Sequence, residues 1–324
     1  MVVCGNRQVH GIDYSETFAP VAKMVTVRTI LAVAASCHWE LHQMDVDNAF
    51  LHGDLHEEVY MHLPPGFSVS SPGKVCRLLR SLYGLRQAPR CWFSKLTTSL
   101  RKYGFCQSHA DYSLFTLRRD RQILCVLIHV DDLLIMGNDR DMIMAFKAFL
   151  ATSFPVKDLG IMKYFLGIEV ARNSTGIFLC QRKYVLDILA ETGLTGARPV
   201  SFPMIQNHKL QSDTGPNFSD PERYRRLVGK LIYLTLTRPD ISYYVHILSQ
   251  FMQCPKMAHW EAVLRVLRYL KSHPGQGILL RSDSALTLMG YCDADWASCP
   301  VTRRSVTGYF VSLGQSPISW RTKK

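Results

Sequence analysis

The chain has 324 residues, with 38 Lys and Arg against 26 Asp and Glu, and therefore carries a formal charge of +12. Hydrophobic residues make up 47% and charged residues 20%, which is typical of a folded protein and excludes a largely disordered one. An apolar run of about 18 residues is missing, which excludes a transmembrane helix and predicts a chain of about two domains with no membrane partner.

The first residues and the cysteines indicate the compartment. The opening MVVCGNRQVHG lacks the apolar segment of a secretory signal, so we expect an intracellular chain that is not secreted. The ten cysteines are scattered without a CxxC pair. Their spacing argues against a zinc knuckle, a thioredoxin-type site and a disulfide scaffold.

The N-terminal part of the chain alternates between helical and strand patterns. Thr26 is a suitable N-cap for a helix that ends near Cys37, and a short strand over 41–46 follows. Loop composition then occupies residues 64–66 and 68–73. The next amphipathic helix has Pro89 in its first turn and Gly104 as its end.

Further strands and helices are predicted up to residue 195. The predicted strands cover 112–117, 123–128, 133–136, 164–170 and 177–180, with the second and third forming a hairpin. Asn138 is the expected N-cap of the helix after this hairpin, and another helix is expected over 183–192.

A change of composition divides the chain. Residues 196–219 are rich in Pro, Ser, Gly and Asn, which predicts a linker. Helical patterns follow over 221–236, 239–252 and 259–271, and short strands return over 278–320. The expected fold class is α+β, in four parts with boundaries 1–195, 196–219, 220–275 and 276–324.

Positive charge is concentrated between Val59 and Ala110, where no Asp or Glu occurs. Aromatic residues are interleaved with the cations, a combination expected of a path for nucleic acid. A solvated helix face beside a core stripe is the alternative interpretation. The cations of this basic stretch are Lys74, Arg77, Arg80, Arg86, Arg90, Lys95, Arg101 and Lys102.

Three carboxylates stand out against apolar surroundings. Asp45 ends a predicted strand, and Asp131 and Asp132 lie between two apolar strands. If these strands are neighbours, the carboxylates can hold two divalent cations such as Mg²⁺, which clamp the oxygens of a phosphoryl transfer. Adjacent residues of an extended segment point to opposite faces, so we expect Asp131 to be the direct ligand of the pair. A surface turn is the alternative, disfavoured by the apolar run 123–128.

Several long motifs now resemble one family. They include GIDYSETFAPVAK, MDVDNAFLHGDLHEEVYMHLPPGF, VCRLLRSLYGLRQAPRCWF, HVDDLLIMGN, KDLGIMKYFLGIEV and YCDADWASCPVTRRSVTGYFVSLG. In this order they are similar to the reverse transcriptase of copia-type long-terminal-repeat retrotransposons, and the resemblance covers nearly the whole chain.

The resemblance implies a fold and an activity. The fold would be a right-hand polymerase palm with partial fingers, followed by a helical thumb and connection and an incomplete RNase H-like sheet. The activity would be RNA-directed DNA synthesis with two Mg²⁺ ions, for which Mn²⁺ can substitute. Implied partners are an RNA template, a DNA primer and product, a dNTP, and the integrase and protease segments of the parent Pol polyprotein. The family works in cytoplasmic virus-like particles or in the nucleus.

The same resemblance assigns roles to individual residues. Asp45, Asp131 and Asp132 match the catalytic, metal-binding aspartates of the palm. Phe50 matches the aromatic residue that excludes the ribose 2′-hydroxyl, and Gln87 matches a glutamine of the nucleotide pocket.

Other matched positions lie later in the chain. Lys157 matches a lysine suggested to protonate the leaving pyrophosphate. Residues Phe165, Leu166 and Gly167 resemble the primer grip, and Asp293 matches the first RNase H aspartate.

Departures from the family pattern shape the expected activity. His129 stands where the family has Tyr, most of the fingers segment before GIDYSETF is missing, and the remaining RNase H acids would follow Lys324. We therefore expect slow or absent polymerisation and no RNase H activity.

Two alternatives to an active polymerase remain. One is a non-catalytic nucleic-acid-binding remnant that keeps the basic surface. The other is a metal-dependent glycosyltransferase, suggested by the DxD patterns at 45–47 and 293–295 and disfavoured by the absence of alternating βαβ units.

Overall fold

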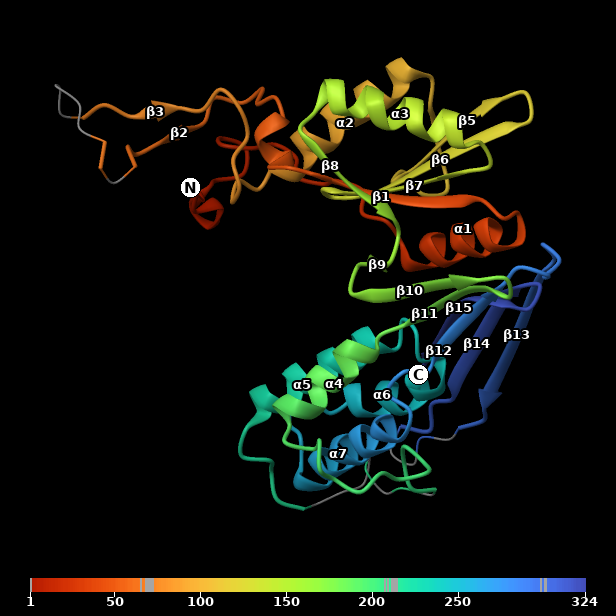
Figure 1. Cartoon of the computed structure of the whole chain (residues 1–324). Coiled ribbons are helices and arrows are strands. Elements are labelled where there is room, and N and C mark those ends of the chain that lie inside the picture. The colour runs from red at the N-terminus through yellow and green to blue at the C-terminus, as the bar shows by residue number, and fades with distance from the viewer. Residues whose placement is uncertain are drawn as a thin grey trace. The chain divides into compact units, whose positions relative to one another are not determined.

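The computed structural model describes residues 2–64, 66–67, 73–206, 208, 210, 215–297, 299 and 302–324. The chain divides into two compact units (Figure 1). Unit 1 comprises Met1–Val27 and Trp39–Met162, and unit 2 comprises Arg28–His38 and Lys163–Lys324. Both contain helices and strands, as the α+β class requires.

Four sequence predictions fall partly outside the described residues. The residues concerned are 65 and 68–72 of the two predicted loops, 207, 209 and 211–214 of the predicted linker, and 298, 300 and 301 of the region of short strands predicted over 278–320. The described residues 196–206 form neither helix nor strand. The division into four parts stays a prediction. Within the described ranges, no helix has the length and apolar character needed to cross a membrane.

Unit 1 is built on a six-stranded antiparallel sheet with the order β4-β5-β6-β7-β1-β8. Its strands are β1 (Glu40–Val46), β4 (Cys106–Gln107), β5 (Leu114–Arg119), β6 (Gln122–His129), β7 (Asp132–Gly137) and β8 (Val156–Ile161). A separate two-stranded ribbon pairs β2 (Tyr60–Met61) with β3 (Cys76–Arg77). The described residues of the unit also form the short 3₁₀ helices η1 (Gly5–Arg7) and η2 (Ala49–His52).

Two helices cover one face of this sheet, α2 (Ala88–Tyr103) and α3 (Arg140–Ser153) (Figure 1). The helix α2 has a proline in its first turn and ends at Gly104, whose φ of 112° suits a residue without a side chain. Its apolar side chains Trp92, Leu96 and Leu100 pack with Phe146 of α3 in one buried cluster.

The alternation of side chains assigns each residue of β1 and β7 to a face. Met44 and Val46 of β1 and Leu133 of β7 belong to the buried cluster under α2 and α3. Successive residues of a strand point to opposite faces. Asp45 and Asp132 therefore project from the other face, opposite the two helices.

Unit 2 contains two further antiparallel sheets. The four-stranded sheet has the order β12-β11-β10-β9, and the three-stranded sheet has the order β13-β14-β15. The strands are β9 (Tyr164–Phe165), β10 (Ile168–Asn173), β11 (Gly176–Cys180), β12 (Gly277–Arg281), β13 (Leu288–Asp295), β14 (Val306–Leu313) and β15 (Ser316–Lys323).

The helices of unit 2 share one apolar core. They are α4 (Arg182–Glu191), α5 (Pro221–Leu234), η4 (Pro239–Ile241), α6 (Ser242–Ser249) and α7 (Met257–Ser272). Inside the core, the hydroxyl of Tyr224 donates a hydrogen bond of 2.8 Å to the carbonyl of Leu248, which satisfies a polar group that is fully buried. The helix α1 (Met24–Ser36) lies for the most part in unit 2.

Several predicted boundaries are corrected by local hydrogen bonds. Thr26 is not an N-cap, because α1 begins at Met24 and the Thr26 hydroxyl donates to Asp111 at 2.6 Å. The N-cap of α3 is Asp139, which accepts the Met142 N–H at 2.7 Å, and not Asn138. Asn138 instead bridges the turn between β5 and β6, where it contacts Ile123 N–H and the Arg121 carbonyl.

Two predicted elements are interrupted. The strand predicted over 164–170 is two strands, since Leu166 and Gly167 have positive φ values and form a turn between β9 and β10. The helix predicted over 239–252 consists of η4 followed by α6, which ends at Ser249.

Candidate active site

The three carboxylates predicted from the sequence come together at one end of β1. Asp45 of β1 and Asp132 of β7 are register partners in the antiparallel ladder. Asp131 lies in the two-residue turn between β6 and β7, and its carbonyl accepts the N–H of Val46 at 3.1 Å. Directly opposed residues of an antiparallel pair project from the same face, so Asp45 and Asp132 are close neighbours.

The charges of this acidic cluster act on one another. The pKa of Asp45 is raised, first by its partial burial and then by the charges of Asp131, Asp132 and Asp47. The charge of Lys157 opposes this shift. A raised pKa in a group of like charges reports negative charge that is not fully compensated.

The turn that carries Asp131 is strained and held from outside the sheet. Val130 has a φ of 61°, a left-handed conformation that a β-branched residue rarely adopts. The indole Nε1 of Trp92, from α2, donates to the Val130 carbonyl at 2.7 Å. Backbone strain of this kind persists only where the surroundings fix it, and here a buried tryptophan does so.

Two further residues adjoin Asp132. The amide of Gln43, two positions before Asp45 on the same face of β1, donates to Asp132 Oδ1 at 3.1 Å. His129 faces Asp132 across the β6–β7 ladder and is half-buried. One oxygen of Asp132 is therefore engaged by Gln43, and the predicted role of Asp131 as the direct ligand stays a prediction.

Among the described residues, no group of three or more His, Cys, Asp and Glu side chains forms a ready-made metal site. The carboxylates are neighbours by strand register and by charge. The predicted metal ligation by Asp45, Asp131 and Asp132 stays a prediction.

Phe50 lies beside the acidic cluster with an aromatic partner that sequence spacing did not reveal. Phe50 is in η2, and its ring centroid is 4.6 Å from that of Tyr83. The pKa of Tyr83 is raised, first by burial and then by the charges of Asp131 and Asp45. Tyr83 therefore stays protonated at neutral pH and lies close to both carboxylates. In the sequence, the one indication that Tyr83 belongs to the site was its position among the aromatic residues of the basic stretch.

Gln87 is placed differently from the other predicted site residues. It has no exposed surface. Its Nε2 donates to the Asp13 carbonyl at 2.9 Å, and its Oε1 accepts from Gln8 at 3.0 Å. Both ends of the amide are thus used within unit 1, and contact with a nucleotide would require these bonds to open. The assigned role in a nucleotide pocket stays a prediction.

Lys157 lies on β8 as the register partner of Asp45, and it is exposed. The residues that resemble a primer grip belong to unit 2, at the turn between β9 and β10. Gly167 there has a φ of 71°, and a Cβ atom would approach the Tyr233 hydroxyl to 2.9 Å, so only glycine fits without a shift. The Tyr233 hydroxyl donates to the Leu166 carbonyl.

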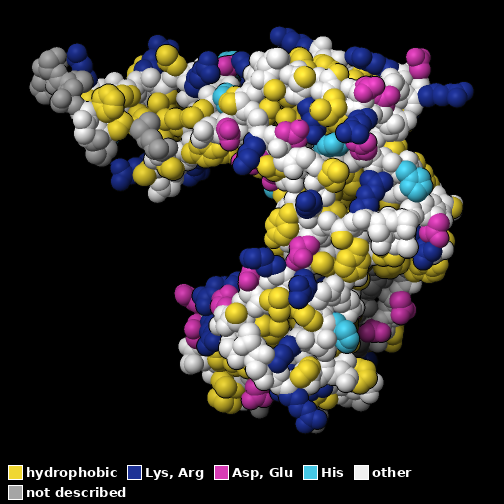
Figure 2. All heavy atoms as spheres, in the orientation of Figure 1, with side chains coloured by type: hydrophobic (Ala, Val, Ile, Leu, Met, Phe, Trp, Pro, Cys, Tyr) yellow, Lys and Arg dark blue, Asp and Glu magenta, His cyan; other side chains and the backbone are white. Residues whose placement is uncertain are grey.

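Several cations of the basic stretch are already engaged by other groups of the chain, which the sequence does not show. Three of its cations form ion pairs with acids outside the stretch, namely Arg77 with Glu58, Arg90 with Glu16 and Lys95 with Asp54. The Arg86 guanidinium donates to the Gly5 carbonyl and the Tyr14 hydroxyl. On the face drawn in Figure 2, acidic side chains are interspersed among the Lys and Arg side chains.

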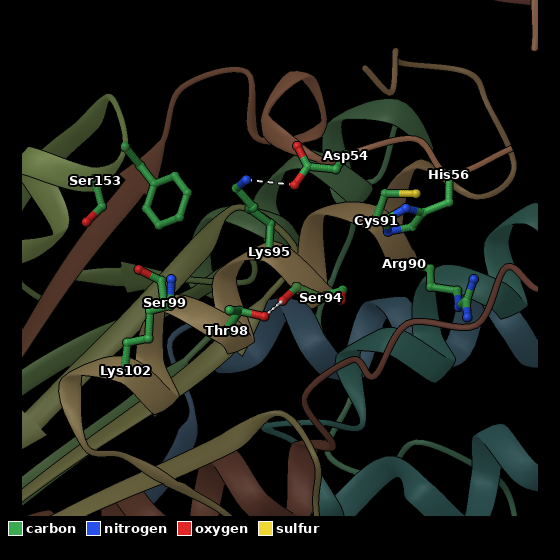
Figure 3. A pocket seen from close by; sticks show the side chains of 11 residues that line it. Asp54, His56, Arg90, Cys91, Ser94, Lys95, Thr98, Ser99, Lys102 and Ser153 are labelled. Atoms are coloured by element: carbon green, nitrogen blue, oxygen red, sulfur yellow. Dashed lines mark hydrogen bonds and ion pairs between the residues drawn. The ribbon is translucent and has the colours of Figure 1, made fainter. Parts of the chain in front are cut away.

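A cavity of about 610 Å³ lies along α2 in unit 1 (Figure 3). Figure 3 shows the ion pair between Lys95 and Asp54 at its wall, with serine and threonine hydroxyls beside it. The lining cations Arg90, Lys95 and Lys102 belong to α2, on the helix-covered face of the sheet. The acidic cluster projects from the opposite face, so this cavity is separate from it.

Asp293 lies in unit 2 on β13, where it is exposed and accepts the N–H of Ala294 at 2.9 Å. A second cavity, of about 330 Å³, includes Asp293 in its lining together with aromatic side chains, among them Tyr243, Tyr291 and Tyr309.

Comparison with known proteins identifies the family of the chain. The sequence profile of the family described as "Reverse transcriptase (RNA-dependent DNA polymerase)" matches residues 1–206. The whole chain is 47% identical to the Retrovirus-related Pol polyprotein from transposon RE2 of Arabidopsis thaliana and 39% identical to that from transposon TNT 1-94 of Nicotiana tabacum. The aligned parts are 22% and 25% of those relatives.

The chain belongs to the reverse transcriptase family, among the Pol polyproteins of copia-type retrotransposons. It spans about a quarter or less of the length of these curated relatives. This membership replaces the glycosyltransferase alternative, which rested on the two DxD patterns alone.

Proposed function

We propose that the chain is an RNA-directed DNA polymerase in which the six-stranded sheet of unit 1 is the polymerase palm. The observation that carries this proposal is the pairing of Asp45 with Asp132 on adjacent strands, with Asp131 in the turn beside them. Two carboxylates on neighbouring strands and a third at the turn provide what a two-metal nucleotidyl transfer needs.

The donor set of the acidic cluster fits Mg²⁺, which prefers hard oxygen ligands. The raised pKa of Asp45, caused by partial burial and by its acidic neighbours, indicates charge that a divalent cation would relieve. Asp45, Asp131 and Asp132 would hold two Mg²⁺ ions, or Mn²⁺ in their place. When bound, the ions stabilise the attacking and leaving oxygens of the phosphoryl transfer.

The surrounding side chains would select and orient the substrates. Phe50 closes one side of the sugar site, where a ribose 2′-hydroxyl pressed against its ring would lack a hydrogen-bond partner. The primer 3′-hydroxyl loses its proton to solvent and attacks the α-phosphate of a dNTP. A bond from the 3′-oxygen to the α-phosphorus forms as the bond to the bridging oxygen breaks, and pyrophosphate leaves. Lys157, on the same face as Asp45, donates a proton to the pyrophosphate.

The other parts of the chain would bind the template and primer. We assign the helices of unit 2 to the thumb and connection, the turn at Phe165, Leu166 and Gly167 to the primer grip, and the sheet β13-β14-β15 to an RNase H-like fold. The partners are an RNA template, a DNA primer and product, and the integrase and protease segments of a parent Pol polyprotein. The place of action would be a cytoplasmic virus-like particle or the nucleus.

Primer extension on poly(rA)/oligo(dT) with Mg²⁺ tests the activity. We expect slow extension by the unmodified chain and a further loss of about 100-fold or more in Asp131→Asn, because an amide cannot take the place of a metal-binding carboxylate. Asp141→Asn, which removes an exposed carboxylate of α3, is the matched control and should extend normally.

The other outcomes are also informative. Extension that survives Asp131→Asn would contradict the assigned site. If extension is absent while binding to the same template–primer is salt-sensitive, the result supports the non-catalytic remnant instead. If neither extension nor binding is seen in a folded chain, the proposal is wrong about both polymerisation and the binding of template–primer.

A further inference from the structure

A charged cluster centred on a buried lysine lies on the opposite face of the unit 1 sheet from the acidic cluster. It consists of Glu40 and His42 of β1, Lys147 of α3 and Asp158 of β8, and we call it the Lys147 cluster. The Nζ atom of Lys147 donates to His42 Nδ1 at 2.8 Å and to the two Asp158 oxygens at 2.9 and 3.0 Å. His42 Nε2 lies 2.9 Å from Glu40 Oε2.

Lys147 is nearly inaccessible and its hydrogen bonds are complete. Its side chain is 6% exposed, and the three protons of its ammonium meet three acceptor atoms. Because His42 accepts at Nδ1, it carries its own proton on Nε2 and donates it to Glu40. A lysine is costly to bury unless it is paired and saturated in this way. The Lys147 cluster is therefore an ordered, fully hydrogen-bonded part of unit 1, and none of its residues is assigned a role in the proposed nucleotidyl transfer.

The strand that receives this lysine is at the edge of the sheet. β8 has one neighbouring strand, β1, among the described residues. The β1–β8 register shifts between Gln43 and Met44, so that Leu159 is left out of the pairing, and Asp158 Oδ1 accepts the N–H of Gly160 at 2.8 Å beside this bulge. A slip of one residue in a strand moves every side chain to the other face. An edge strand with a bulge is the place where such a slip is easiest.

The bonds from Lys147 determine which face each residue of β8 takes. Asp158 pairs with Met44 in register, and its carboxylate reaches Lys147 on the helix-covered face. The preceding residue, Lys157, must then point to the opposite face, where its register partner is Asp45. The residue bound by the buried lysine and the residue beside Asp45 are thus neighbours on opposite faces of β8.

We propose that Lys147 is a positioning residue which, acting through Asp158, fixes the register of β8 and holds the Lys157 ammonium beside Asp45. The position of Lys157 is a property of the fold, whereas its consequence for catalysis rests on the proposed polymerase function. The two are measured separately below.

The position of Lys157 can be measured without activity. In protein labelled with ¹³C at the lysine ε carbons, the Lys157 signal is identified by its loss in Lys157→Arg. We expect Asp45→Asn to shift this signal, because the neighbouring charge is removed. In a Lys147→Met background the same substitution should produce less than about half of that shift, since β8 is no longer fixed. Arg140→Met, which removes an exposed cation at the start of α3, should leave the full shift.

Two results would overturn the proposal. One is a full response to Asp45→Asn in folded Lys147→Met, and the other is no response in the unmodified chain. If Lys147→Met does not fold, Asp158→Asn makes the same test, because its side chain is 46% exposed and its replacement leaves no cavity. A full response in Asp158→Asn would overturn the proposal equally.

The catalytic consequence is tested by a double-mutant cycle in primer extension. We expect Lys157→Met to lower kcat by about 100-fold, as for loss of a general acid, with little change in the KM for dNTP. Lys147→Met should lower kcat by about tenfold, but by less than about twofold when Lys157 is already Met. Additive effects would show that Lys147 acts on folding alone. A chain without activity would refute the proposed function and leave the spectroscopic result to decide on Lys147.

Discussion

At the scale of single residues, the structure suggests a role for Tyr83 in the candidate active site that the sequence motifs did not indicate. Its ring packs against Phe50, and its hydroxyl is near enough to Asp131 and Asp45 for their charges to raise its pKa, after burial as the first cause. Phe50 is half-buried, and it packs against Tyr83 and against two buried apolar clusters. We therefore expect Tyr83 to help hold the ring to which we assign sugar selection.

Tyr83→Ala should weaken discrimination between deoxyribose and ribose substrates. An aromatic pair contributes roughly 0.5–1.5 kcal/mol beyond the area it buries, so the ratio of kcat/KM for dTTP over UTP should fall by about two- to tenfold. Tyr83→Phe keeps the ring and should keep the ratio. An unchanged ratio in Tyr83→Ala would show that Phe50 is held without it.

The contrast between Tyr83 and Gln87 shows what a sequence can predict about a site. The acids Asp45, Asp131 and Asp132 were found because carboxylates next to apolar strands are rare. Gln87 and Tyr83 are four residues apart in one motif, and the sequence does not show which of them is buried. That distinction arises from Gln8 and Asp13, almost eighty residues earlier, whose groups satisfy the Gln87 amide.

At the scale of secondary structure elements, the turn between β6 and β7 was predictable in place but not in conformation. Two apolar runs joined by a short polar segment indicate a hairpin. The left-handed conformation of Val130 depends on the Trp92 indole, which comes from α2 and not from the hairpin. Helix caps show the same limit, because Asp139 and Asn138 are both suitable caps and the tertiary contacts of Asn138 decide between them.

The attachment of β8 to α3 should weaken at low pH. Partial burial tends to raise the pKa of Asp158, but the bonds from Lys147 and from the Gly160 N–H outweigh it and lower the pKa below its ordinary value of 3.8. The folded state therefore favours the carboxylate form. The stability that Asp158 contributes is complete above the ordinary pKa and is lost as the pH falls through the lowered one.

Asp158→Asn should reveal this dependence in urea unfolding measured from neutral to acid pH. At pH 7 the free energy of unfolding should fall by about 1–3 kcal/mol, because Lys147 loses the charge of its main acceptor. The difference from the unmodified chain should stay constant down to about pH 5 and shrink below about pH 4. A difference that persists undiminished at low pH would mean that the carboxylate charge is not what stabilises β8.

At the scale of the whole molecule, the chain carries a charge of +12, but its cations are not equally available to bind phosphates. The sequence shows eight cations without an intervening acid, yet Glu16, Asp54 and Glu58 approach three of them from outside the stretch. Moreover, the cations of α2 lie on the other side of the unit 1 sheet from the acidic cluster. A nucleic-acid strand at the carboxylates can reach α2 only around an edge of the sheet.

Binding of template–primer should weaken steeply with salt if the remaining cations contact phosphates. Each such contact contributes about 0.9 to the slope of log affinity against log salt concentration. Lys74→Gln, which removes an exposed cation of the basic stretch outside α2, should reduce the slope by the value of about one contact. Arg140→Gln, which removes an exposed cation at the start of α3, serves as the control with an unchanged slope. An affinity that does not vary with salt would remove the basic stretch from the nucleic-acid path.

Family membership and the α+β class followed from sequence motifs, while the division of the chain into two units did not. The residues of α1 illustrate why: Arg28 is buried and donates to the carbonyls of Leu236 and Ile318, about two hundred or more residues away. Contacts of such long range leave no periodic pattern in the sequence. They group most of this early helix with the late part of the chain.

The strand β13 affects how this protein behaves in concentrated solution. All eight of its residues are exposed, Leu288 and Tyr291 are among them, and in the described part of the chain it pairs only with β14. In that part of the chain its other edge has no strand partner, and an unpaired edge beside apolar side chains is the kind of edge on which strands of separate molecules pair. We therefore expect self-association through β13 that increases with protein concentration and competes with solubility.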